Sequence, residues 1–236
     1  MKRYLKLFAI VGMLVVLFLI GCDIGSQKEQ KETITRVACV GDSITFRHGF
    51  DEEPENNYPT VLAEILGENY EVVNFGESGT CVQIDGDCAY VDQSVYQSGL
   101  DYDADVLIFM LGTNDSKEWN WNGEDSFREA YEGLLNQYSQ KQDAPKIYIC
   151  ISPKAFYINA KISGAAEFGI EPANVEKIVD IQRQVALDRG YTIIDIYQLT
   201  SQHPEWLEED GIHPTLEGAR GIAEAVAEAI RNEEKE

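Results

Sequence analysis

Basic residues are scarce in this sequence, and the shortage limits what the protein can bind. Only 19 lysines and arginines accompany 41 aspartates and glutamates, which gives a formal net charge of −22 at pH 7 over 236 residues. A surface of that sign repels the phosphate backbones of nucleic acids and the headgroups of anionic lipids. We therefore expect no nucleic acid as a partner and no binding to an anionic lipid surface, and we attribute most of the acidity to solubility.

Metal-binding and repeat patterns are missing as well. The sequence contains no Cys-x-x-Cys pair, no zinc spacing and no internal repeat. Asp101, Asp103 and Asp105 alternate like calcium ligands, but their loop lacks the glycine and the distal glutamate of an EF-hand. We interpret that loop as solvated, and we expect neither a metal nor another cofactor.

The N-terminus has the pattern of a secretory signal. Lys2, Arg3 and Lys6 precede an unbroken apolar run over 7–20, which is short for a membrane span. The run ends in Leu-Ile-Gly-Cys22, which resembles the lipobox of bacterial lipoproteins. The resemblance implies a signal peptide over 1–21, a lipidated Cys22 and an extracytoplasmic location. A buried cysteine after an ordinary signal, or an uncleaved anchor helix, are the alternatives.

The residues after Cys22 are polar and charged and predict a tether over 22–35. Outside the cytoplasm the remaining cysteines can form disulfides. Cys81 and Cys88 lie in one loop and are candidates for a small disulfide loop, whereas Cys39 and Cys150 lie in apolar runs and are expected as buried thiols.

Strand and helix patterns alternate through the rest of the chain, which favours a parallel sheet with helices on both faces. We expect one domain over 36–231, followed by a polar tail over 232–236. The predicted strands are 37–40, 71–75, 106–111, 147–151 and 191–196. The predicted helices are 58–67, 124–141, 172–189 and 215–231, with a short helix near 204–208 and a long loop over 80–105.

Polar groups suited to acyl transfer follow several of these strands. Ser43, Gly79 and Asn114 follow the first three strands, and His213 follows the fifth. The carboxyl ends of parallel strands lie at one edge of a sheet, so these residues can meet there. His213 can take the Ser43 proton, Asp210 can accept from the imidazole, and backbone or amide N–H groups can bind an oxyanion.

Each of these assignments has a competitor. Ser43 could be a simple helix cap, and Ser78 is the other serine of the region, although its surroundings lack the last glycine of a nucleophile elbow. His48 and His203 compete with His213, and Gly76 competes with Gly79 as a donor.

Four blocks carry a family resemblance. Gly-Asp-Ser-Ile-Thr, Asn-Phe-Gly-Glu-Ser-Gly, Gly-Thr-Asn-Asp and Asp-Gly-Ile-His-Pro occur in that order. Together they resemble the SGNH (GDSL-type) hydrolase family, although Ile44 stands where the name-giving motif has leucine. The resemblance implies a flavodoxin-like three-layer α/β/α sandwich with a five-stranded parallel sheet of order 2-1-3-4-5, and esterase or lipase activity without a metal. By the family pattern, Ser43 is the nucleophile, His213 the base and Asp210 its partner. The oxyanion hole is then formed by Ser43, Gly79 and Asn114.

Two tryptophans bear on the substrate. Trp119 and Trp121 flank Asn120 just after the third block, where they can form a sugar-stacking platform or simply pack the loop. No long apolar stretch after the signal suggests a lipid tunnel. We therefore expect an extracytoplasmic serine esterase acting on a small acyl ester, such as acetyl on a carbohydrate. Lysophospholipase, lipase or thioesterase chemistry fits the same residues, and a catalytically silent glycan-binding lipoprotein is the alternative from another class.

Overall fold

The computed structural model describes residues 34–46, 57–156 and 168–233. From Ile34 onward the chain forms one compact unit built on a five-stranded parallel sheet. The strands lie side by side in the order β2-β1-β3-β4-β5, as predicted. Their bounds are β1 Thr35–Gly41, β2 Tyr70–Gly76, β3 Val106–Met110, β4 Lys146–Cys150 and β5 Thr192–Ile194.

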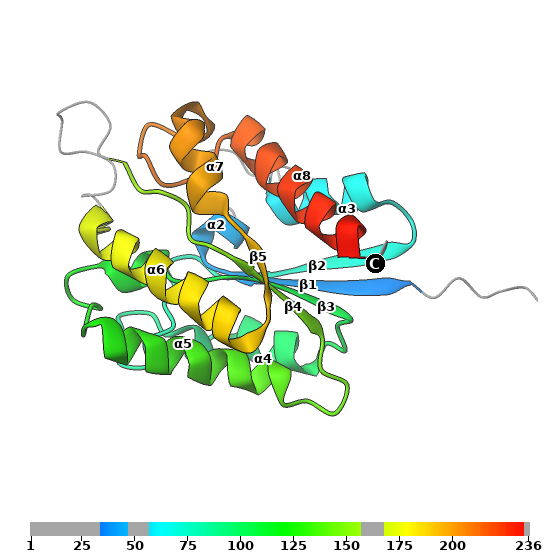
Figure 1. Cartoon of the computed structure of the whole chain (residues 1–236), viewed down its shortest axis with the longest axis horizontal. Coiled ribbons are helices and arrows are strands. Elements are labelled where there is room, and N and C mark those ends of the chain that lie inside the picture. Colours follow the sequence, from blue (N-terminus) through cyan, green and yellow to red (C-terminus); the bar gives the residue numbers. More distant parts are fainter. Residues whose placement is uncertain (1–33, 47–56, 157–167, 234–236) are drawn as a thin grey trace, which may run out of the picture. The chain divides into compact units, whose positions relative to one another are not determined.

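Helices cover both faces of this sheet, which confirms the predicted three-layer sandwich. In Figure 1, α3 and α8 lie on one side of the sheet, and α4, α5 and α6 lie on the other. The described part of the chain also contains the 3₁₀ turns η2 Tyr90–Asp92, η3 Thr113–Ser116 and η4 Pro204–Trp206. The α-helices are α2 Ser43–Phe46, α3 Tyr58–Leu66, α4 Ser94–Asp101, α5 Glu124–Ser139, α6 Pro172–Arg189, α7 Ile196–Gln202 and α8 Leu216–Glu233. Within the described ranges, none of these helices has the length and apolar character to cross a bilayer.

The core lies on both faces of the central strands. All five residues of β3 are buried, which fits a strand that has neighbours on both sides and helices above and below. Phe109 of β3 meets the ring of Tyr131 from α5 edge-on, with 5.3 Å between ring centroids. Aromatic pairs of this geometry add to the burial of apolar area in fixing a helix on a sheet.

The structure differs from the sequence-based expectation in two regions of the chain. The long loop expected over 80–105 contains α4, whose buried Gly99 faces Phe75 of β2. The fifth strand is shorter than expected because Asp195 caps α7 by accepting a hydrogen bond from the Gln198 N–H. Ile196 therefore begins a helix, and α7 was not predicted.

The close packing at the end of β1 sets the position of the turn that follows. A Cβ atom at Gly41 would lie 2.0 Å from Thr45 Oγ1 and 2.7 Å from the Met110 carbonyl oxygen. Only glycine fits there, and the chain can turn at once into α2. Asp42 stabilises this turn by accepting the Ile44 N–H at 2.9 Å. Ser43 is thereby presented at the carboxyl edge of the sheet.

The predicted signal peptide over 1–21, Cys22 and nearly all of the predicted tether over 22–35 lie outside the described residues. Among the described residues, the first element begins at Thr35 and the last ends at Glu233.

Candidate active site

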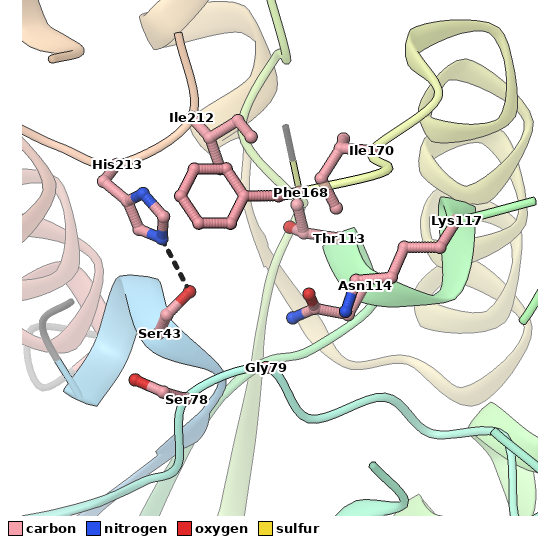
Figure 2. Close-up of a pocket in the computed structure, with 10 residues that line it drawn as sticks. All are labelled: Ser43, Ser78, Gly79, Thr113, Asn114, Lys117, Phe168, Ile170, Ile212 and His213. Atoms are coloured by element: carbon pink, nitrogen blue, oxygen red, sulfur yellow. Dashed lines mark hydrogen bonds between the residues drawn. The ribbon is translucent and has the colours of Figure 1, made fainter. Parts of the chain in front are cut away.

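Ser43, His213 and Asp210 form a chain of hydrogen bonds at the carboxyl edge of the sheet. Ser43 Oγ lies 2.9 Å from His213 Nε2, although 170 residues separate them in sequence. His213 Nδ1 lies 2.5 Å from Asp210 Oδ2. Figure 2 shows the Ser43 hydroxyl pointing at the imidazole from the start of α2. The arrangement can carry a proton from the hydroxyl to the ring.

Asp210 is held in place by the loop that carries His213. Its Oδ1 accepts the backbone N–H groups of Ile212 and His213, both at 2.9 Å, so Oδ2 is left to face the imidazole. A carboxylate on Nδ1 keeps the ring proton there, which leaves Nε2 free to accept the proton of Ser43. The ring of Phe168 meets the imidazole edge-on at 5.3 Å and shields it on another side.

Electrostatics favour the ionised form of Asp210. Burial raises the pKa of this carboxyl, but the hydrogen bonds from the His213 ring and from the backbone outweigh burial and bring the pKa below its ordinary value. Asp210 is therefore a carboxylate at neutral pH and stabilises an imidazolium beside it.

A small cavity opens in front of the Ser43–His213 pair. Its volume is about 250 Å³, and Figure 2 shows the residues around it. Polar groups line one side and apolar side chains the other. The lining residues are Ser43, Ser78, Gly79, Thr113, Asn114, Lys117, Phe168, Ile170, Ile212 and His213.

The oxyanion-hole candidates line this cavity together. The Asn114 side chain donates one amide hydrogen to the Thr80 carbonyl at 3.0 Å. That bond fixes the amide while its second hydrogen has no acceptor in the described part of the chain. Gly79 has a φ of +80°, a conformation that favours glycine, in the turn that reaches the cavity. Ser43, Gly79 and Asn114 thus bring donors from three separate turns to one cavity.

Asp115, the last residue of the third sequence block, anchors the loop after Gly79. Its carboxylate accepts the N–H groups of Val82 and Gln83 at 3.0 Å. Burial raises the pKa of Asp115 to about 7, although these two N–H groups oppose the shift and the nearby charge of Asp42 adds to it. Asp42 is also fully buried, and burial raises its pKa to about 6 against the N–H of Ile44 and the charges of His213 and Lys117.

The competing residues lie differently. Ser78 lines the cavity, but its buried Oγ makes no hydrogen bond within the described residues. His203 stacks on Trp206 with ring centroids 4.3 Å apart, and its Nδ1 lies 2.9 Å from Glu205 Oε1. His48 falls outside the described residues.

The two tryptophans do not form one platform. Trp119 is 58% exposed, and its Nε1–H donates to Asp87 Oδ2 at 2.8 Å. Its ring lies over Gly169, where a Cβ atom would approach within 2.1 Å. Trp121 instead packs against the core through Phe127, with ring centroids 6.3 Å apart.

The candidate disulfide is absent from the structure, which corrects that expectation. Cys81 and Cys88 are free thiols. Their sulfur atoms have different partners: Cys81 Sγ lies 3.5 Å from the carbonyl oxygens of Gln83 and Cys88, whereas Cys88 Sγ accepts from Gln93 Nε2 at 3.6 Å. The loop is closed by backbone hydrogen bonds instead, including Cys81 N–H to Cys88 O at 2.9 Å.

Cys39 and Cys150 are buried free thiols on β1 and β4, with β3 between those strands. Within the described ranges, no three histidine, cysteine or acidic side chains are grouped so that they could hold a metal ion.

The sequence is related to a protein named as an esterase. It is 33% identical over 218 residues to an acetylxylan esterase of Xylanibacter ruminicola, and the match covers 85% of this chain and 44% of that protein. The chain therefore spans less than half the length of this relative.

The fold also matches solved structures. A carbohydrate acetylesterase from Sinorhizobium meliloti has a TM-score of 0.67 at 18% identity, covering 84% of this chain and 99% of that chain. A putative arylesterase from Agrobacterium tumefaciens has a TM-score of 0.70 at 19% identity, with the same coverage of 84% and 99%. At such low identities these structures show a shared fold.

The family model described as GDSL-like lipase/acylhydrolase matches residues 39–220, a range that holds all four sequence blocks. The resemblance found in those blocks is thereby confirmed: the chain belongs to the GDSL-like lipase/acylhydrolase family, whose members are carboxylic ester hydrolases.

Proposed function

We propose that this protein is an extracytoplasmic serine esterase that removes a small acyl group, chiefly acetyl, from a carbohydrate. The observation that carries the proposal is the bonded chain Ser43–His213–Asp210 facing a cavity that also holds Gly79 and Asn114. Nucleophile, base, orienting carboxylate and oxyanion donors are the parts that acyl transfer requires.

The first half-reaction forms an acyl-enzyme. Ser43 Oγ attacks the ester carbonyl carbon while His213 Nε2 takes the hydroxyl proton, and the carbonyl electron pair moves onto oxygen. The N–H groups of Ser43 and Gly79 and the free amide hydrogen of Asn114 bind that oxyanion. Collapse breaks the bond to the alcohol, which leaves with the proton from His213.

In the second half-reaction, water replaces the alcohol. His213 takes a proton from the water, whose oxygen attacks the acyl carbon, and the second tetrahedral intermediate collapses to release the carboxylic acid. Ser43 recovers its proton from His213. Asp210 stays ionised throughout and stabilises the imidazolium.

The cavity supports a small acyl group. Its volume of about 250 Å³ lies below the range of roughly 300–1,000 Å³ that is typical for sites holding drug-sized ligands. Phe168, Ile170 and Ile212 give it an apolar wall suited to a methyl group. An acyl chain of many carbons would extend beyond the cavity formed by the described residues.

Two observations support a carbohydrate as the alcohol. The exposed ring of Trp119 offers an aromatic face of the kind on which sugars stack, close to the cavity residue Lys117. The acetylxylan esterase of Xylanibacter ruminicola, a protein named for an acetylated glycan, matches most of this chain.

The extracytoplasmic location rests on the N-terminal sequence. The basic residues, the apolar run and Cys22 have the order of a lipoprotein signal. In a bacterial host that lipidates its own lipoproteins, Cys22→Ala should abolish labelling of this protein by a fatty-acid probe. Unchanged labelling of that variant would contradict the lipid anchor.

The activity is tested with two substrate series. Wild type and Ser43→Ala are compared on 4-nitrophenyl esters of increasing chain length and on acetylated xylan oligosaccharides. We expect wild type to prefer acetyl, to deacetylate the oligosaccharides, and to exceed Ser43→Ala by several orders of magnitude. Equal background rates for both proteins would favour a silent glycan-binding protein, and a maximum at long chains would favour a lipase.

A further inference from the structure

We propose that Lys117 contributes a positive charge to the oxyanion hole and thereby stabilises the tetrahedral intermediate. The inference rests on the esterase activity proposed above and adds a residue that none of the four sequence blocks contains.

The local backbone places Lys117 beside Asn114. Asn114 lies in the 3₁₀ turn η3, and the Lys117 N–H closes the turn by donating to the Asn114 carbonyl oxygen at 3.3 Å. Side chains three residues apart in a 3₁₀ turn leave the backbone on the same side. Figure 2 shows the Lys117 side chain running toward the amide of Asn114, and both residues line the cavity.

The ammonium group is buried and only partly neutralised. Lys117 is 7% exposed, and its Nζ lies 3.3 Å from Asp87 Oδ2. Asp87 also accepts shorter bonds, from Trp119 Nε1 and Asn120 Nδ2 at 2.8 Å each. The Asp87 side chain is 38% exposed, so water screens its charge more than that of the lysine. Two of the three ammonium hydrogens have no acceptor within the described ranges.

The site needs such a charge. Two fully buried carboxyl groups are sequence neighbours of the reacting groups: Asp42 precedes Ser43, and Asp115 follows Asn114. When ionised, they disfavour a second negative charge on the ester oxygen. The charge of Lys117 acts on the Asp42 carboxyl beside Ser43, because it lowers the pKa of Asp42 against the effect of burial. A cation at the wall of the cavity offsets the repulsion where the oxyanion forms.

The expected size of the effect follows from Coulomb's law. A charge several ångströms from the oxyanion, at an effective dielectric constant of about 20 and partly neutralised by Asp87, changes kcat by roughly 10- to 100-fold. A charge that acts only on the intermediate should change kcat and leave KM nearly constant.

The competing explanation is a structural one, in which the Lys117–Asp87 pair merely clamps two loops together. The two explanations differ for Asp87→Asn. Loss of the clamp should lower kcat as much as loss of the lysine does. Under the proposal, Asp87→Asn removes the negative charge that partly neutralises Lys117, so the lysine attracts the oxyanion more strongly and kcat is maintained or rises.

The experiment compares kcat and KM on 4-nitrophenyl acetate for wild type, Lys117→Met, Lys117→Gln, Lys117→Arg and Asp87→Asn. We expect both neutral variants to lose at least tenfold in kcat with little change in KM, and Lys117→Arg to recover most of the loss. Lys117→Gln keeps a hydrogen-bond donor and serves if Lys117→Met does not fold. Lys177→Met, which removes an equal charge from the exposed face of α6, is the matched control and should retain full kcat.

Two results would overturn the inference: neutral variants within threefold of wild-type kcat, or an Asp87→Asn variant as impaired as Lys117→Met. Failure of the proposed function looks different, because wild type itself would then be no faster than Ser43→Ala.

Discussion

Asparagine in place of Asp210 should remove most of the activity while preserving the fold. The Asp210 carboxylate accepts three hydrogen bonds, two on Oδ1 from the backbone of Ile212 and His213 and one on Oδ2 from the imidazole. An asparagine has a single acceptor atom. If its oxygen keeps the two backbone bonds, its NH₂ group faces His213 Nδ1 and forces the ring proton onto Nε2. The ring can then no longer accept the proton of Ser43.

The alternative orientation of the asparagine is also unfavourable. Turning the amide oxygen toward His213 loses two backbone hydrogen bonds and leaves two N–H groups facing an NH₂ group. Each lost bond costs about 1 kcal/mol, and each unsatisfied buried donor costs about 1–3 kcal/mol. Only the second orientation leaves His213 Nε2 able to accept a proton, so reaching it adds about 2–6 kcal/mol to the barrier. That cost corresponds to a loss of roughly 30- to 10⁴-fold in kcat/KM.

The assay is the steady-state hydrolysis of 4-nitrophenyl acetate, with thermal unfolding measured in parallel. Glu209→Gln is the matched control, because it removes the same charge from the neighbouring exposed side chain, and it should retain wild-type kcat/KM. If Asp210→Asn kept more than a tenth of the wild-type kcat/KM, the tautomer argument would be refuted.

Three further predictions follow from the site and the core. Asn114→Ala should lower kcat by roughly 10²- to 10³-fold, with a smaller change in KM, because an oxyanion donor is lost. The measurement is the hydrolysis of 4-nitrophenyl acetate. If Asn114 only held the loop through its bond to Thr80, the variant would instead have a lower melting temperature and an unchanged kcat. Burial raises the pKa of the Asp42 carboxyl to about 6. Between about pH 4 and pH 6 the folded protein therefore keeps the Asp42 proton, whereas the unfolded chain releases it. The free energy of unfolding should thus fall as the pH rises through this range. Denaturant titrations should show wild type losing about 3 kcal/mol relative to Asp42→Asn between about pH 4 and pH 8, and parallel pH curves would contradict this. Thiol titration should find Cys39 and Cys150 unreactive in the folded protein and reactive in denaturant. Both thiols are buried, and burial raises the pKa of Cys39 to about 12. Labelling of either thiol before unfolding would contradict the described core.

The sheet was predictable because its strands carry strong local signals. Val106–Met110 is apolar at every position, which is typical of a central parallel strand, and the helix over 172–189 begins at a proline and ends at Gly190 in the left-handed conformation. The strand order came from the family resemblance, since residue patterns alone do not determine which parallel strands are neighbours. The proximity of Ser43 to His213 followed from the rule that strand ends share one edge.

The missed features depend on contacts between distant segments. α4 has few apolar residues, and it packs against β2, a contact that the local sequence pattern does not reveal. Lys117 looks like an ordinary loop lysine in the sequence, and its burial against Asp87 appears only after two loops are brought together. The Cys81–Cys88 expectation considered spacing and compartment, whereas the structure closes the same loop with backbone hydrogen bonds.

The distance of 170 residues between nucleophile and base has a consequence for biosynthesis. A ribosome finishes β1 and the serine turn early, but the imidazole emerges only with the last loop before α8. That helix packs against α3, an early element, so this contact forms only after the end of the domain has been synthesised. A nascent chain therefore cannot cleave esters during translation, and activity begins only when the whole domain has been completed and folded.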